Sequence, residues 1–196
     1  MPTKRKIWSS KQDALNETES RMLLNGCVDL LDNLVVRLPL YAGMRIGEVA
    51  HLKASWLDFK KMLITIPARQ LCNCPECSRR KQQGIWTPKS DAGQRALPIT
   101  RELEPYLRQL GNDGIARSKR SLEFRFQKIR ERSGLKKRCY PHALRATYLT
   151  GLSEMGISAP SLTYLAGWSS LRPSESYIQS SMKRAHKELS ELSSGK

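Results

Sequence analysis

The sequence predicts a mostly helical α+β domain in which one small antiparallel sheet, of about three strands, packs beside a helical bundle. Apolar residues recur at spacings of three and four over residues 17–38 and again after residue 100, whereas alternation is confined to the segment between them. The 196 residues suit one domain, and 39% hydrophobic residues suffice for a core without a disulfide or a metal. We expect the domain to cover residues 17–192, after a linker remnant at 1–16 and before a tail at 193–196.

Two helices are expected first. The apolar spacing predicts one continuous helix over residues 17–38, and the segment Tyr41-Ala42-Gly43 ends it because glycine permits a tight turn. A short second helix is expected over residues 45–53.

The strands follow. Met62, Ile64 and Ile66 alternate with Leu63 and Thr65, which is typical of a strand. A cysteine-rich and basic insertion is expected over residues 72–84. The segments 85–87 and 95–99 are predicted to form a hairpin that pairs around Asp91-Ala92-Gly93.

From Thr100, a suitable N-cap, the chain is predicted to be helical to its end. Proline stands near two of the helix starts, where it is tolerated. One helix is expected to begin near Leu103, and a second to lie within Arg117–Arg138. Three more are expected over residues 142–156, 160–167 and 174–192.

The charge predicts a polyanionic partner. The formal net charge is +16, and Arg117–Arg138 supplies half of it, with ten basic and two acidic residues. Leu122, Phe126 and Ile129 recur there at helical spacing, so we expect an amphipathic helix with a cationic outer face. The residues expected to contact double-stranded DNA are Arg125, Lys128, Arg132, Lys136 and Lys137, with Arg79, Arg80 and Lys81 of the insertion.

We expect an intracellular protein that does not enter a membrane. The start of the chain is polar and basic, and the most apolar stretch, Leu30–Tyr41, is interrupted by charged and polar residues. An odd number of cysteines, five, suits a reducing interior.

Six residues form a candidate catalytic set: Arg45, Lys89, His142, Arg145, Trp168 and Tyr177. Glu48 lies three residues after Arg45, so it can hold that guanidinium on one helical face. His142 and Arg145 lie three apart at the edge of an apolar stripe. Taken singly, these residues also suit a surface ion pair, a local histidine hydrogen bond and aromatic packing.

The order of these six residues, and the short motifs in which they stand, resemble those of the tyrosine recombinase (phage integrase) family. The tryptophan-to-tyrosine spacing of nine residues agrees with that family, as does the expected hairpin around Lys89. The matching boxes are Gly43-Met44-Arg45-Ile46-Gly47-Glu48, Thr87-Pro88-Lys89-Ser90-Asp91-Ala92-Gly93, His142-Ala143-Leu144-Arg145, Leu165-Ala166-Gly167-Trp168 and Tyr177.

The resemblance implies a tyrosine recombinase-like catalytic domain that cleaves and rejoins DNA at specific sites. It also implies a cytoplasmic, nucleoid-associated protein of prokaryotic or viral origin. Tyr177 would be the nucleophile and form a 3′-phosphotyrosyl intermediate, while Arg45 and Arg145 stabilise the charge on the phosphate. No cofactor is required for such catalysis. Trp168 stands where the family more often has histidine, and an indole only donates. Proton delivery would therefore fall to Lys89, and His142 is the better acceptor of the tyrosine proton.

The insertion carries a possible metal site in the cluster Cys72, Cys74 and Cys77, whose spacing suits structural Zn²⁺. A fourth ligand would have to come from Cys27, Cys139 or His51. Reduced loop cysteines without a metal are the alternative, and a disulfide is disfavoured in a reducing interior.

Two other functions share parts of this pattern. A type IB topoisomerase has the same active-site chemistry, and a catalytically inactive DNA-binding protein would keep the basic surface. Full-length members of the family usually also have an N-terminal domain that completes a clamp around DNA, so the chain would be either a catalytic-domain fragment or a naturally minimal protein. The resemblance further implies a homo-tetramer on DNA, with a monomer as the alternative for the free protein. The C-terminal helix would dock either on a neighbouring subunit or on its own domain.

Overall fold

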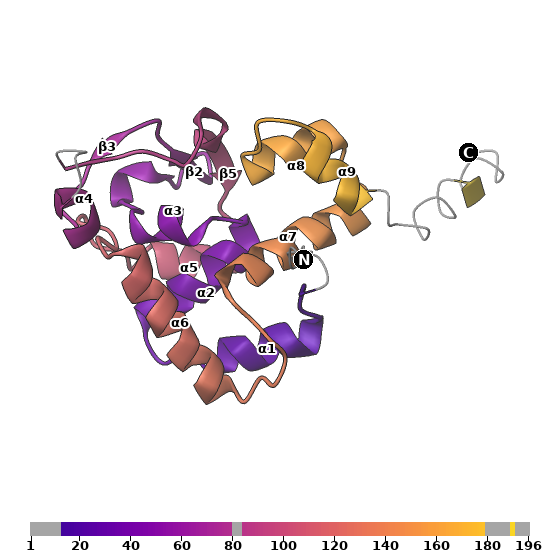
Figure 1. The fold of residues 1–196 in the computed structure, drawn as a ribbon, viewed down its shortest axis with the longest axis horizontal. Coiled ribbons are helices and arrows are strands. Elements are labelled where there is room, and N and C mark those ends of the chain that lie inside the picture. The colour runs from indigo at the N-terminus through magenta and orange to yellow at the C-terminus, as the bar shows by residue number, and fades with distance from the viewer. Residues whose placement is uncertain (1–12, 80–83, 179–188, 191–196) are drawn as a thin grey trace, which may run out of the picture.

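The computed structural model describes residues 13–79, 84–178, 189 and 190 (Figure 1). The fold is mostly helical with one small three-stranded antiparallel sheet, as predicted. In Figure 1 the strands lie above α2 and α3, α6 and α1 lie below them, and α8 and α9 form one end of the molecule. Most of the predicted helix over residues 174–192 lies outside the described residues.

The predicted continuous helix at residues 17–38 is wrong: the segment forms α1 (Glu17–Asn25) and α2 (Leu30–Ala42). Asp29 accepts a hydrogen bond from the backbone of Asp32 at 2.8 Å and so caps a new helix. Gly26 packs so closely on α6 that a Cβ there would lie 2.6 Å from the Ile129 carbonyl oxygen. The break therefore turns α1 onto α6.

Gly43 ends α2 in the left-handed conformation, with φ +61°, as its place in the sequence predicts. The short helix α3 (Ile46–Ala50) follows directly. α2 supplies the centre of the core and packs along α7 (Pro141–Glu154), so the two arginine boxes of the sequence are brought to one region.

The sheet has the order β1-β2-β5, formed by β1 (Leu57–Asp58), β2 (Leu63–Ile66) and β5 (Arg95–Pro98). The 3-10 turn η1 (Ala54–Trp56) leads into β1. Ile64 is opposite Leu97, and both are buried. The strand predicted from Met62, Ile64 and Ile66 is thus confirmed over Leu63–Ile66, whereas Met62, with φ +54°, precedes it.

The predicted hairpin between residues 85–87 and 95–99 is wrong. β4 (Ile85–Trp86) pairs with β3 (Gln70–Leu71), and β5 pairs with β2. Trp86 buries its indole against Trp56, with ring centroids 5.3 Å apart, so β4 is drawn away from β5. The intervening loop contains the 3-10 turn η2 (Asp91–Gly93).

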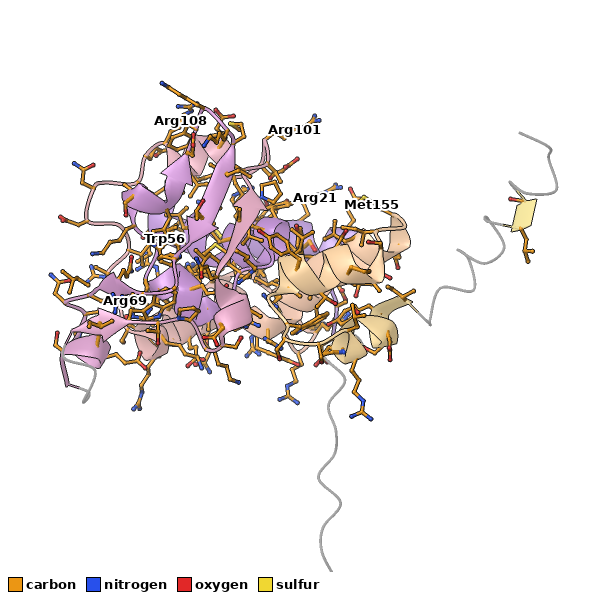
Figure 2. All side chains as sticks on the ribbon, turned by 90° about the horizontal axis from the view of Figure 1, so that it is seen from above. Arg21, Trp56, Arg69, Arg101, Arg108 and Met155 are labelled. Carbon is orange, nitrogen blue, oxygen red and sulfur yellow. The ribbon has the colours of Figure 1, made fainter. Side chains whose placement is uncertain are left out.

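The remaining helices are α4 (Pro75–Arg79), α5 (Glu104–Leu107), α6 (Lys119–Ser133), α8 (Ala159–Ala166) and α9 (Arg172–Ile178). α6 buries Leu122, Phe126 and Ile129, as their spacing predicts. Met155, directly after α7, is exposed at the periphery, whereas Trp56 lies in the interior (Figure 2). Within the described residues, every helix is too short or too polar to cross a membrane.

Candidate active site

Glu48 lies at the centre of the site and binds two arginines. Its Oε1 accepts a hydrogen bond from Arg45 Nη1 at 2.9 Å, so the contact expected from the sequence is confirmed. The same carboxylate accepts two hydrogen bonds from Arg95, one at each oxygen and both at 2.9 Å. Burial alone would raise the pKa of Glu48, but the hydrogen bonds and charge of Arg95, with the charges of Arg45 and Arg145, hold it below its usual range.

Arg45, directly before α3, and Arg145, within α7, both reach the turn that follows α8. Arg45 Nη2 donates to the Gly167 carbonyl at 2.7 Å, and Arg145 Nη2 donates to the neighbouring Ala166 carbonyl. Arg145 Nη1 also donates to the carbonyl of Gly43, two residues before Arg45. Backbone carbonyls therefore fix the planes of both guanidiniums.

The turn at Gly167 leaves no room for a side chain. Gly167 ends α8 with φ +57°, and a Cβ there would lie 2.9 Å from Arg95 Nη1 and 3.1 Å from Arg45 Nη1. The glycine before Trp168 is therefore what allows the arginines to reach the backbone of this turn.

Trp168 and Tyr177 pack on each other at the end of the site, with ring centroids 5.6 Å apart. Tyr177 lies in α9 and is only 6% exposed, within the small cluster formed with Leu149, Leu162 and Ala166. Ser153 Oγ of α7 donates to the Tyr177 carbonyl at 2.8 Å. α9 thus docks on α7 and α8 of its own chain.

Lys89, His142 and Arg45 line one open cleft of about 1010 Å³. Lys89 reaches it from the loop between β4 and β5 and is exposed, and His142 reaches it from the first turn of α7. Lys119 and Arg130 of α6, with Arg138, add positive charge to its walls, where they outnumber Glu76 and Glu123, the second of which lies 3.4 Å from Lys119 Nζ. The cleft is therefore suited to an anion larger than one phosphate.

Electrostatic interactions connect five of the six predicted positions. Partial desolvation and the charges of Arg145, Arg45 and Lys89 lower the pKa of His142, which favours its neutral form. Burial and the charge of Arg45 lower the pKa of Arg145 to about 9, so it stays protonated at neutral pH, and Tyr177 is among the groups that act on it. Trp168 joins the set through its contact with Tyr177.

The residues that the sequence predicts to contact DNA lie in different environments in the structure. Arg125 and Arg132 form ion pairs with the buried Asp32, and Lys137 Nζ lies 3.1 Å from Glu19, so these three connect α6 and the segment after it to α1 and α2. Lys128 and Lys136 are exposed and lie outside the cleft lining. The side chains of Arg79, Arg80 and Lys81 lie outside the described part of the structure.

Sequence reasoning missed Arg95 and the two α6 cations of the cleft. Arg95 stands at an inward position of a strand, where a buried arginine is rare without a partner, and that placement was the available signal. For α6, Lys119 and Arg130 share the side of the helix that carries the buried Phe126, whereas Arg125 and Arg132 point toward α2.

The predicted cysteine cluster comes together with a histidine. The ligand atoms of Cys72, Cys74, Cys77 and His51 all lie within 4.8 Å of one another. Of the three candidates for a fourth ligand, the described residues bring only His51 into this group.

Comparison with known proteins agrees with this geometry. A family model described as the phage integrase family matches residues 12–184. The tyrosine recombinase XerC of Chlamydia caviae is 29% identical over 157 residues, which are 78% of this chain and 48% of the relative. XerC of Chlamydia pneumoniae is 29% identical over 161 residues, 79% of this chain and 48% of the relative. The chain spans about half the length of the curated relatives it matches.

Solved structures share the fold. The integrase of transposon Tn1549, in complex with transposon right end DNA, superposes with a TM-score of 0.72 at 21% identity, over 92% of this chain and 66% of that one. The catalytic domain of bacteriophage HP1 integrase gives a TM-score of 0.58 at 20% identity, over 89% of this chain and 93% of that one. The fold class predicted from the sequence is confirmed, and the family match covers most of the chain. The protein described here belongs to the phage integrase family.

Proposed function

We propose that this chain is the catalytic domain of a site-specific tyrosine recombinase, which cleaves and rejoins double-stranded DNA through a 3′-phosphotyrosyl intermediate. One observation carries the proposal: Arg45 and Arg145 donate to the consecutive carbonyls of Gly167 and Ala166, in the turn that leads to Trp168. The ring of Trp168 in turn packs on Tyr177. Two arginines and a tyrosine thus lie around one turn, which supports a shared role for them in binding and cleaving one phosphodiester.

The reaction needs only these side chains and DNA. The Tyr177 oxygen attacks the scissile phosphorus, a tyrosine oxygen–phosphorus bond forms, and the bond from phosphorus to the 5′-oxygen breaks. Negative charge grows on the two non-bridging oxygens, where Arg45 and Arg145 stabilise it. The phosphodiester is conserved in the protein–DNA bond, so attack by a 5′-hydroxyl rejoins the strand without ATP.

Protons are assigned by the chemistry of the remaining residues. His142, whose pKa is lowered, is neutral near pH 7 and can accept the tyrosine proton. Lys89 is exposed in the loop beside the cleft and can deliver a proton to the leaving 5′-oxygen. Trp168 can donate a hydrogen bond but cannot shuttle a proton, since its indole nitrogen acts only as a donor and accepts no proton in exchange.

Recombination between two duplexes requires four active sites, so we infer a homo-tetramer on DNA. We also infer that it acts in the compartment that holds chromosomal or mobile-element DNA. The cationic cleft supports DNA as the partner, since Lys119, Arg130 and Arg138 extend positive charge away from Arg45. Tyr177 is buried against its own domain, so we infer that α9 shifts when DNA enters, which brings the tyrosine to the phosphate.

Trapping on nicked DNA tests this function. A pool of end-labelled nicked duplexes, randomised around the nick, is incubated with the protein, and adducts that resist denaturant are isolated. Wild type is expected to form an adduct that Tyr177→Phe abolishes, whereas the control Tyr164→Phe, on the neighbouring helix, retains it. DNA binding without any adduct would favour the inactive DNA-binding protein, and plasmid relaxation without strand exchange would favour a topoisomerase.

A further inference from the structure

Three cysteines and one histidine meet where the segment from β3 to β4 contacts α3. Cys72 and Cys74 follow β3, Cys77 lies in α4, and His51 follows the last residue of α3. Their ligand atoms lie within 4.8 Å of one another, and the four residues are 7%, 2%, 3% and 4% exposed, in that order. We propose that these residues bind one structural Zn²⁺.

The histidine is oriented as a metal ligand. His51 Nδ1 lies 2.6 Å from the Gly47 carbonyl oxygen, which can only accept, so the proton is on Nδ1. The lone pair of Nε2 then points at the thiols, 3.4 Å from Cys74 Sγ and 3.3 Å from Cys77 Sγ. A backbone carbonyl that fixes the second ring nitrogen is a regular feature of zinc-binding histidines.

Backbone amides favour negative charge on the sulfurs. The Cys74 amide donates to Cys72 Sγ, and the Cys77 amide donates to Cys74 Sγ, both at 3.4 Å. Zinc binds the thiolate form of cysteine, so these hydrogen bonds stabilise the form that the metal needs.

The spacing of the ligand atoms fits a tetrahedral ion. Zinc–sulfur bonds of about 2.3 Å and a zinc–nitrogen bond of about 2.0 Å place neighbouring ligand atoms roughly 3.5–3.8 Å apart. The His51–Cys74 and His51–Cys77 distances of 3.4 and 3.3 Å are already close to this value. A group of four protein ligands without an open position is typical of structural zinc, not of catalytic zinc.

The surroundings exclude water from the group. Trp86 stacks on His51, with ring centroids 5.1 Å apart and an interplanar angle of 19°.

A disulfide would use two of the three thiols and leave His51 with one, whereas zinc uses all four residues. The two other cysteines lie apart, since Cys27 Sγ donates to the Leu23 carbonyl and Cys139 is buried outside the group.

The site joins two segments that reach the cleft. His51 is six residues from Arg45, and Trp86 is three residues before Lys89. Cys77 and His51 line the same cleft as Arg45 and Lys89. The metal therefore fixes the Lys89 loop relative to α3; the importance of this for catalysis rests on the proposed function, whereas metal binding does not.

Metal analysis of the purified chain tests the proposal without DNA. We expect about one zinc per chain, and a cobalt-substituted protein with the absorption bands of a tetrahedral thiolate site. Cys74→Ser and His51→Ala are expected to weaken metal binding at least about tenfold. The matched controls Cys27→Ser and Cys139→Ser are expected to keep one zinc.

Wild-type protein alone decides the outcome if the ligand variants fail to fold. Chelation of the wild type is expected to lower its melting temperature and to increase hydrogen exchange over residues 84–90, and added zinc is expected to reverse both changes. A wild-type chain that binds no zinc on reconstitution, carries iron instead, or keeps its melting temperature under chelation overturns the proposal. Unchanged affinity in His51→Ala overturns the histidine assignment.

Discussion

The Glu48 carboxylate and the Arg95 guanidinium form a two-pronged ion pair inside the protein, with both nitrogen–oxygen distances 2.9 Å and side-chain exposures of 3% and 0%. Arg95 also donates to the carbonyls of Leu165 and Gly93, each at 2.9 Å. The pair thus connects α3, β5, the end of α8 and the loop after Lys89. It holds in place the elements that carry Arg45 and Trp168.

Removing Arg95 is expected to cost stability as well as site geometry. Arg95→Leu leaves part of the Glu48 charge buried without compensation, so the free energy of unfolding should fall by about 3 kcal/mol, measured by urea denaturation. The control Arg21→Leu breaks the exposed pair with Glu17 and should cost less than about 1 kcal/mol. Equal losses in the two variants would contradict the role assigned to Arg95.

Glu48 also predicts an acid-sensitive stability. Because its pKa is lower in the folded than in the unfolded chain, its contribution is complete above the usual carboxyl pKa of about 4.3 and is lost as the pH falls through the lowered value. Urea midpoints measured in acid should therefore fall less steeply for Glu48→Gln than for wild type. The exposed control Glu154→Gln should follow the wild-type curve, and parallel curves for all three would show that Glu48 titrates normally.

The cleft cations are expected to determine how DNA affinity depends on salt. Lys119→Gln and Arg130→Gln should each lower the slope of log affinity against log salt by about 1, because each removes one phosphate contact. Arg125→Gln should leave the slope unchanged and reduce the free energy of unfolding instead, since Arg125 pairs with the buried Asp32. A slope change confined to Arg125→Gln would place DNA on the other side of α6.

His142 is expected to titrate below its usual range. In the proposed mechanism the neutral form of His142 accepts the tyrosine proton. The rate of adduct formation should therefore reach its maximum above about pH 6.5 and should decrease as the pH falls through the lowered pKa. The imidazole resonance, assigned by its loss in His142→Gln, should have its midpoint below about 6.5. Lys89→Gln should raise that midpoint by removing a positive charge, and a wild-type midpoint above 6.5 would exclude this electrostatic picture.

Local patterns in the sequence predicted most of the helices. The core face of α6 follows from Leu122, Phe126 and Ile129, and the end of α2 follows from Gly43. The break at residues 26–29 was missed because the apolar spacing continues through it, while the cap at Asp29 and the close packing of Gly26 decide the backbone path.

Pairing between distant segments could not be predicted in the same way. The hairpin prediction failed because Trp86 finds its partner in Trp56, some thirty residues away. The candidate catalytic residues were predicted from the order of their motifs along the chain, whereas Arg95 was missed because it stands in none of these motifs. Likewise, His51 was one of three candidate ligands, and only the packing of α3 on the segment from β3 to β4 brings it to the cysteines.

The most direct test is mass spectrometry of the trapped protein–DNA adduct after protease and nuclease digestion. The account predicts a single modified peptide that contains Tyr177, with the phosphate of a 3′-nucleotide on the phenolic oxygen, and a free 5′-hydroxyl on the released strand. A nucleotide attached to another residue, or a 5′-phosphate linkage, would contradict the assignment of Tyr177 as the nucleophile and of Arg45 and Arg145 as the groups that bind the scissile phosphate.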